Sequence, residues 1–313
     1  MMCSWESLDR SAWSLSSHNR SMRTLLFTLL PVLLSAQTET IQGTIHLAET
    51  NHCDQALPQL RRMLGHVADP HLKKQAEMDG LTCGMSLNSV DDALAFLMAL
   101  NYDFKTDPEV LYLSAGALSD LSARYGQTLL STAPNSPDAH VLSAEGLEAQ
   151  GKWDEAAAEY RRAIQLNPNR PGLHFRLGRM QLNRPATATS AAEGERELQQ
   201  ELRVDPNNAE AEFILGDRAR EAHQWQDAAQ HFNRAVQIDA NFGDAFLGLG
   251  MTYLQSGRPQ DATLPLERAA RIEPNNPAVH AQLAQAYGQI GRTADAQRET
   301  QAQQQLERQN PPH

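Results

Sequence analysis

The sequence predicts an all-α protein, an α-solenoid of stacked helical hairpins. A pattern of small and large residues fills residues 137–170 and returns four more times toward the C-terminus. Its period is 34 residues, as between Leu249 and Leu283, which is enough for two helices and their turns. A chain of 313 residues could instead form two globular domains. A repeat of this length favours an elongated array in which each copy contacts only its neighbours.

Each copy carries a marker in both helices. The first helix has Leu-Gly or a near equivalent: Ser143-Ala144, Leu177-Gly178, Leu215-Gly216, Leu249-Gly250 and Leu283-Ala284. The second helix has a large residue between two small ones, with a proline after it in the first copy: Ala156, Tyr160, Ala163 and Pro168. Gly or Ala on one helix admits the large side chain of its neighbour, so the markers predict antiparallel helix pairs.

These residues resemble the tetratricopeptide repeat, known for Trp-x2-Leu-Gly-x2-Tyr followed by Ala, an aromatic residue, Ala and Pro. The resemblance covers residues 137–310 as five repeats: 137–170, 171–208, 209–242, 243–276 and 277–310. It implies a right-handed superhelix and a non-catalytic scaffold, without cofactors, that binds a protein or peptide in its concave groove.

The resemblance also implies which residues line that groove, since first helices form the inner surface in this family. The same helix phase in successive copies selects Val141, Glu145, Phe175, Arg179, Phe213, Asp217, Leu247 and Met251. We expect apolar partner side chains to dock on the apolar members and Arg179 and Asp217 to fix the register. The alternative for Phe175 and Phe213 is packing between repeats.

The N-terminal region has the layout of a secretory signal. In residues 20–36, basic residues precede an apolar run, 25–34, and small residues end the segment. The run falls short of the roughly 20 residues that span a bilayer. We therefore interpret residues 1–36 as leader and signal peptide, cleaved after Ala36, with translation starting at Met1 or Met22. The mature chain is expected to be periplasmic or secreted, without membrane insertion.

Residues 37–136 read as a degenerate region of the same helical type. Residues 72–87 and 90–100 predict a helix pair with Asn88 at the turn. Asp107 and Pro108 then open a helix, because Asp can cap and Pro suits the first turn. We expect one and a half helices in residues 107–136.

Two cysteines, Cys53 and Cys83, remain once a leader containing Cys3 is removed. An oxidising compartment permits a bond between them. The predicted helices place both at neighbouring ends of antiparallel helices, so we expect a disulfide; the alternative is two buried free thiols.

No motif for catalysis is evident. We find no nucleophile elbow, phosphate-binding Gly loop, His-Glu-x-x-His or Cys-x-x-Cys. His140, His174 and His280 share one repeat phase, but equivalent positions in adjacent repeats lie too far apart for one metal ion. A net charge of -11 argues against nucleic acid as partner.

Two further segments are interpreted as surface. The second repeat contains a four-residue insertion, and residues 183–193 are expected to form a loop. The acidic residues that follow are expected to form a solvated face: Glu193, Glu195, Glu197 and Glu201. In the last repeat, polar residues replace the usual apolar ones, which is typical of a solvating cap.

The function expected from the sequence is a protein-binding scaffold in an envelope assembly. The alternative is a regulatory or targeting subunit for a separate envelope enzyme, such as a peptidase or glycan synthase.

Overall fold

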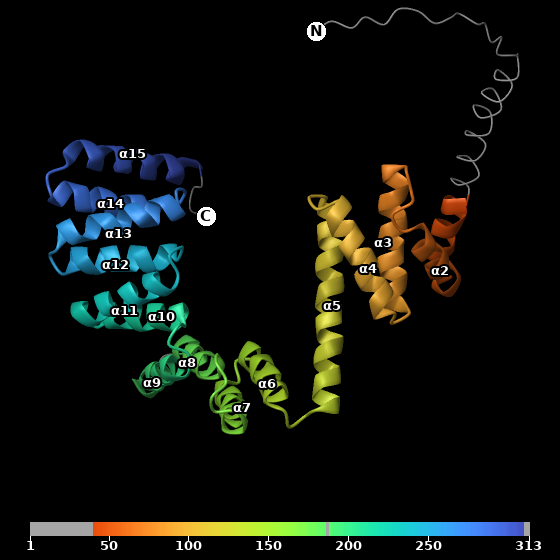
Figure 1. Cartoon of the computed structure of the whole chain (residues 1–313), viewed down its shortest axis with the longest axis horizontal. Helices are drawn as coiled ribbons and strands as arrows, with labels where there is room; N and C mark the ends of the chain where they lie inside the picture. Colours follow the sequence, from red (N-terminus) through yellow and green to blue (C-terminus); the bar gives the residue numbers. More distant parts are fainter. Residues whose placement is uncertain (1–39, 186–187, 310–313) are drawn as a thin grey trace, which may run out of the picture. The chain divides into compact units, whose positions relative to one another are not determined.

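A computed structural model describes residues 40–185 and 188–309, which form α-helices joined by short turns (Figure 1). The chain divides into two compact units after Gln127, here called unit 1 and unit 2. The predicted leader, residues 1–36, lies outside the described residues. Among the described helices, none is both long enough and apolar enough to be a membrane span.

Unit 1 begins with a helix over residues 40–49. The helices that follow are α2 (Cys53–Met63), α3 (Pro70–Ser86), α4 (Val90–Asp103) and α5 (Pro108–Thr132), the last of which runs past the division. The predicted pair is confirmed as α3 and α4, and Asn88 in their turn has a positive φ of 57°.

The start of α5 is also confirmed, since Asp107 Oδ1 accepts hydrogen bonds from the backbone N–H of Glu109 and Val110. The expectation of one and a half helices was wrong. A single helix of 25 residues continues to Thr132, since Gly116 and Gly126 are accommodated within it and no proline follows Pro108.

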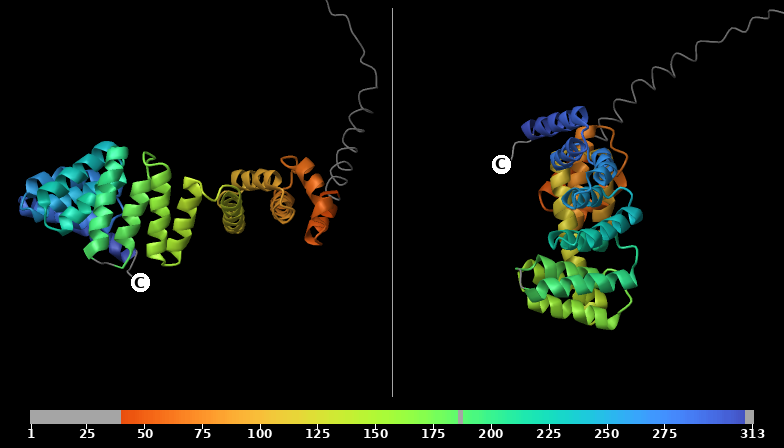
Figure 2. Two further views of the ribbon diagram at one scale, coloured as in Figure 1. Left: turned by 90° about the horizontal axis from the view of Figure 1, so that it is seen from below. Right: turned by 90° about the vertical axis from the view of Figure 1, so that its left-hand side faces the viewer.

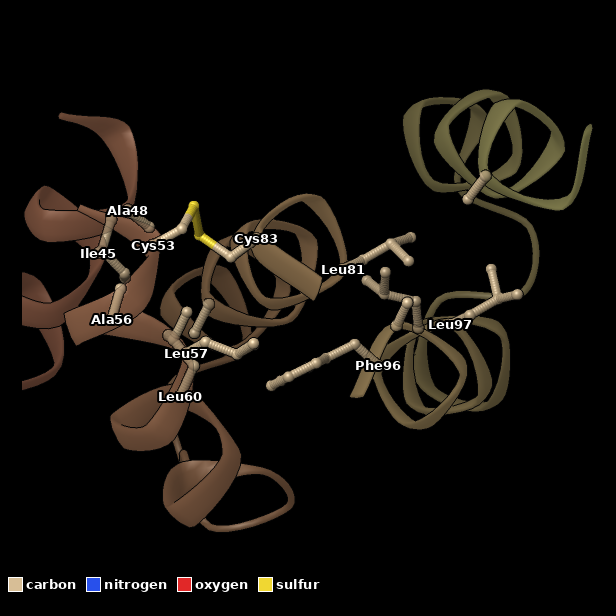
Figure 3. Packing of buried hydrophobic residues seen from close by; sticks show 14 of the residues in the cluster. Ile45, Ala48, Cys53, Ala56, Leu57, Leu60, Leu81, Cys83, Phe96 and Leu97 are labelled. Carbon is tan, nitrogen blue, oxygen red and sulfur yellow. A yellow bond between two sulfur atoms is a disulfide. The ribbon is translucent and has the colours of Figure 1, made fainter. Parts of the chain in front are cut away.

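The core of unit 1 is one continuous cluster contributed by all its helices. Phe96 of α4 lies so close to Gly80 of α3 that a Cβ atom there would come within 2.5 Å of its ring. Leu60 and Leu81 are buried beside it, and Cys53 and Cys83 complete the cluster (Figure 3).

Unit 2 contains five hairpins whose paired helices lie antiparallel (Figure 2). They are α6 (Pro137–Ala149) with α7 (Trp153–Leu166), α8 (Leu173–Asn183) with α9 (Ala188–Val204), α10 (Ala209–Glu221) with α11 (Trp225–Ile238), α12 (Gly243–Gln255) with α13 (Pro259–Ile272), and α14 (Pro277–Gln289) with α15 (Thr293–Gln309). The predicted all-α solenoid of hairpins is confirmed.

The markers read from the sequence are the packing contacts of the hairpins. A Cβ atom on Gly216 would lie 3.0 Å from the ring of Phe232, and one on Gly250 would lie 2.4 Å from Leu266. Both large side chains have no exposed surface. A small residue is needed at these positions because the neighbouring helix approaches closely, and at Gly250 the approach leaves no room for a Cβ atom unless Leu266 shifts.

The turns inside four of the five hairpins use left-handed backbone. Gly151, Gly257 and Gly291 have φ of 72°, 74° and 81°. In the third hairpin His223 takes the corresponding place with φ of 59°.

The insertion in the second repeat is mostly helical, so the predicted loop at residues 183–193 was wrong. Helix α8 ends at Asn183 and α9 already begins at Ala188. Helix α9 has 17 residues, against 14 in α7. The added Ala-rich residues extend the second helix instead of the turn, because alanine favours helix.

The array has several small cores instead of one large one. Separate buried clusters join α6–α8, α8–α10, α10–α12 and α12–α14. Helix α15 has no buried residue, which confirms the predicted solvating cap. Each hairpin therefore packs within itself and against its immediate neighbours only.

Candidate functional site

The residues predicted to line the groove lie on the first helices α6, α8, α10 and α12. None of the eight is fully buried, and Arg179 is exposed. Val141, Phe175, Phe213 and Leu247 each pack one side against a buried cluster. The structure thus places these eight residues in equivalent positions of successive hairpins. We call them the first-helix stripe.

The two phenylalanines of the stripe contribute to packing between hairpins. The Phe213 ring lies 5.0 Å from that of Phe242 and 5.8 Å from that of Phe232, measured between centroids. Phe175 packs against the cluster that contains Leu198. Both rings remain partly exposed. One side of each ring packs in the core, and the other side is open to solvent.

The charged residues of the stripe differ in their partners. Glu145 forms an ion pair with Arg176 of α8, and Asp217 pairs with Arg220 at 2.6 Å. Among the described residues no carboxylate forms an ion pair with Arg179, whose guanidinium carbon lies 5.7 Å from the centroid of the Phe175 ring. Arg179 is therefore the charged group of the stripe that is open to a ligand.

The sequence prediction missed both arginine partners. Arg220 lies three residues after Asp217, a spacing that brings helical side chains together and could have been used. Arg176 is 31 residues from Glu145, and only the packing of α6 against α8 brings them together.

A buried carboxylate positions the first turn of α8. Glu201 has no exposed surface, and it accepts hydrogen bonds from the backbone N–H of Gly172 at 2.6 Å and of Phe175 at 3.1 Å. A third donor, Asn208 Nδ2, lies at 3.4 Å. The predicted solvated face was therefore wrong for Glu201.

The signal that could have revealed this contact is a missing cap. Ser136, Asn208 and Asn276 cap α6, α10 and α14 with their own side chains. Helix α8 has Gly172 at that position, which has no side chain to accept the first N–H groups. Glu201 supplies the acceptor from the second helix and thereby fixes the backbone of Phe175.

A His–Glu pair joins the two helices of four hairpins. The Nδ1 to carboxylate distances are 2.6 Å for His140–Glu159, 2.7 Å for His174–Glu197, 2.6 Å for His231–Glu212 and 2.7 Å for His280–Glu299. The third pair is reversed, with the glutamate on the first helix. The repeated histidines that the sequence analysis considered as metal ligands therefore bind carboxylates within their own hairpins.

Two cavities of unit 2 lie away from the stripe. One of about 520 Å³ lies between α9, α10 and α11 and is lined by charged residues, among them Arg218 and Asp227. Another of about 420 Å³ lies between α11 and α12, beside Trp225 and Tyr253. No stripe residue lines either cavity, and among the described residues no cluster suited to a metal ion occurs.

Unit 1 contains the predicted cysteine pair as a disulfide. Cys53 at the start of α2 and Cys83 late in α3 are bonded, and both are buried (Figure 3). The bond joins two antiparallel helices of the cluster described above.

Family models match two segments of the array. One, described as a TPR repeat, matches residues 148–183, and one described as a tetratricopeptide repeat matches residues 219–264. The two matched segments, which cover parts of α6–α8 and α10–α13, carry tetratricopeptide repeats. Repeats of this family mediate contacts between proteins and are typically non-catalytic.

Solved structures agree on the fold. A MamA double mutant is 15% identical, with a TM-score of 0.51, and covers 56% of this chain and 97% of its own. A MamA fragment from Desulfovibrio magneticus RS-1 is 15% identical, with a TM-score of 0.50 and the same coverage. Another MamA structure is 19% identical, with a TM-score of 0.50, covering 56% of this chain and 96% of its own. No curated protein matches the chain.

Proposed function

We propose that unit 2 binds a peptide segment along its first-helix stripe, and that the protein works as a scaffold in an envelope assembly. The segment would place apolar side chains on Phe175, Leu247 and Met251 and a carboxylate on Arg179. The observation that carries the proposal is the partly exposed apolar residue at one position of successive first helices. Such a surface is already ordered before binding, which lowers the entropic cost of binding an extended or helical segment.

The charge pattern supports an acidic group in the ligand. Glu145 and Asp217 are already paired with arginines. A basic ligand group could bind either carboxylate only by displacing its arginine. Arg179 has no such partner among the described residues, and a carboxylate there would form a charge-assisted hydrogen bond.

The envelope location rests on two supports. The sequence of residues 20–36 has the layout of an export signal. The Cys53–Cys83 disulfide is of a kind that persists in oxidising compartments and is rare in the cytosol. N-terminal sequencing of the fractionated native protein tests this part, with Gln37 as the expected first residue. A cytoplasmic protein that retains residues 25–34 would overturn it.

A peptide library displayed on phage tests the ligand class. We expect the selected peptides to share apolar residues and an Asp or Glu. With Arg179→Glu as bait, the acidic preference should change to Lys or Arg, because the charge at the stripe is reversed. The matched control is Arg234→Glu on the second helix α11, also exposed, which should select the original peptides.

Met251→Glu tests the apolar part of the same surface. Met251 is partly exposed on α12, so the fold should persist while binding of the selected peptides is lost. Unchanged binding by both Arg179→Glu and Met251→Glu would rule out the stripe. Phe213→Ala is unsuitable for this purpose, because the ring also packs between hairpins.

A further inference from the structure

In the sequence, helix α5 follows the α3–α4 pair and precedes the α6–α7 hairpin, and it forms no hairpin with a described helix. The helices on either side of it pair as α3 with α4 and as α6 with α7, but no described helix packs along α5 in this way. One face of α5 contributes Val110 and Ala117 to the core of unit 1. On the same face, Ser114 accepts a hydrogen bond from Asn101 Nδ2 of α4 at 3.0 Å.

The other face of α5 exposes large apolar side chains. Leu111, Leu118 and Tyr125 recur every seven residues and are 47%, 53% and 59% exposed. Ala115 and Ser122 lie between them, so the spacing alternates between four and three residues. This is the pattern of a helix that packs along another helix. We call these five residues the α5 seam.

Exposure of large apolar residues is concentrated in this part of the chain. In the described residues, those exposed between 87 and 130 are Leu87, Leu94, Met98, Tyr102, Leu111, Tyr112, Leu118, Tyr125 and Leu130. The other two, Leu166 and Leu264, are isolated in unit 2. Clustered exposure of this kind marks an interaction surface, whereas single exposed residues need no explanation.

We propose that the α5 seam pairs with the α5 seam of a second copy of this chain. The charges of α5 favour a copy over a charged partner. Glu109 is paired with Lys74 at 2.8 Å, and Asp120 with Arg124 at 2.7 Å, all within unit 1. The seam itself is uncharged, so two copies bring no like charges together.

The two helices run antiparallel, with the two-fold axis at Leu118. Antiparallel pairing aligns opposite helix dipoles, which is favourable. It places Leu111 opposite the partner's Tyr125, and it brings Ala115 within one residue of the level of the partner's Ser122. Leu118 then faces the same residue of the partner, as a two-fold interface requires. Each bulky tyrosine meets a leucine, which avoids stacking two tyrosines in one layer.

The area of the seam determines the expected affinity of the dimer. A pair of helices of this length buries on the order of 1,000 Å² in total, at the low end of specific interfaces. We therefore expect a dimer that dissociates in the micromolar range, on the order of 1 to 50 μM.

Light scattering with size-exclusion chromatography tests the dimer on the purified native protein. Between roughly 1 and 200 μM, the mass should rise from that of one chain to that of two. Leu118→Glu should remain monomeric throughout, because it buries two charges at the axis. The matched control, Leu264→Glu, replaces an exposed leucine of α13 and should dimerise like the unsubstituted protein. A chain that stays monomeric at every concentration overturns the proposal, as does a Leu118→Glu variant that still dimerises.

Cross-linking tests the seam without disturbing the fold. Leu118→Cys should form a disulfide-linked dimer under mild oxidation, with the unsubstituted chain as control. A mixture of Leu111→Cys and Tyr125→Cys chains should cross-link with each other, whereas Tyr125→Cys alone should not. Self-cross-linking of Tyr125→Cys would overturn the antiparallel register, and failure of Leu118→Cys to cross-link would overturn the interface.

Discussion

Unit 1 and unit 2 are both built from antiparallel helices, yet different interactions stabilise them. Unit 2 repeats the same contacts in each hairpin, with small residues against large ones and a His–Glu pair in four of five hairpins. Unit 1 lacks this repetition. It has a disulfide, and its buried carboxyl oxygens on Glu77 and Asp79 lack hydrogen-bond partners among the described residues.

The difference shows two ways in which antiparallel helices are stabilised. Where neighbours supply regular contacts, packing and the His–Glu pairs stabilise the hairpins without a disulfide. Where the pattern is lost, a covalent bond offsets less regular packing and the desolvation of buried acids. The predictions below test this comparison region by region.

The largest expected effect is the loss of the central packing residue of unit 2. Phe232 has no exposed surface and packs against Gly216, Gly248 and the ring of Phe213. Phe232→Ala should destabilise the array by about 3–5 kcal/mol. Hydrogen exchange measured by mass spectrometry should show faster exchange in α10–α12 and no change in unit 1. The control Leu264→Ala should shift stability by less than about 0.5 kcal/mol.

Removing the disulfide should affect unit 1 alone. The Cys53→Ser, Cys83→Ser double variant opens a loop with a sequence separation of 30 residues. Its loss should destabilise unit 1 by about 3–4 kcal/mol in the chain-entropy model. Hydrogen exchange should accelerate in α2–α4 and stay unchanged in α12–α15. Equal acceleration in both regions would contradict the comparison.

Glu77 should make the stability of unit 1 depend on pH. Burial raises the pKa of Glu77 to about 7, although Lys73 acts in the opposite direction. The unfolded chain has the ordinary value of 4.5, so the folded state binds more protons between these values. The contribution of Glu77 to the free energy of unfolding should therefore be greatest below pH 4.5 and fall as the pH rises through 7.

The loss should be no more than about 3 kcal/mol, measured by denaturant unfolding across this pH range. Glu77→Gln should remove most of the dependence. Burial also raises the pKa of Asp79, to about 6, so a smaller dependence should remain. If the pH profile is unchanged in Glu77→Gln, the Glu77 carboxyl of the unsubstituted protein is solvated and does not cause the pH dependence.

The smallest expected effect concerns the His–Glu pairs. His174→Ala should destabilise the array by about 1 kcal/mol, because it removes one partly buried hydrogen bond. The double variant His174→Glu, Glu197→His should recover most of that loss, since Glu212 and His231 already form the pair in reversed order. Thermal unfolding of the three proteins measures this. No recovery in the double variant would show that the order is set by other neighbours.

The sequence by itself determined the hairpins of unit 2. The spacing of glycines and large residues is a local property, and it reports the close approach of adjacent helices at Gly216 and Gly250. The positions of the first-helix stripe and the approximate ends of most helices follow from the same period. Sequence reasoning also selected the cysteine pair, because few cysteines were available.

Only the tertiary structure decided which polar groups meet across the array. Glu201 caps α8 through contacts with residues 26 and 29 positions away, and Glu145 pairs with an arginine 31 positions away. It also decided that no described helix forms a hairpin with α5 and that the seam is exposed. These contacts depend on how hairpins stack, and stacking brings together residues whose separation in sequence follows no local pattern.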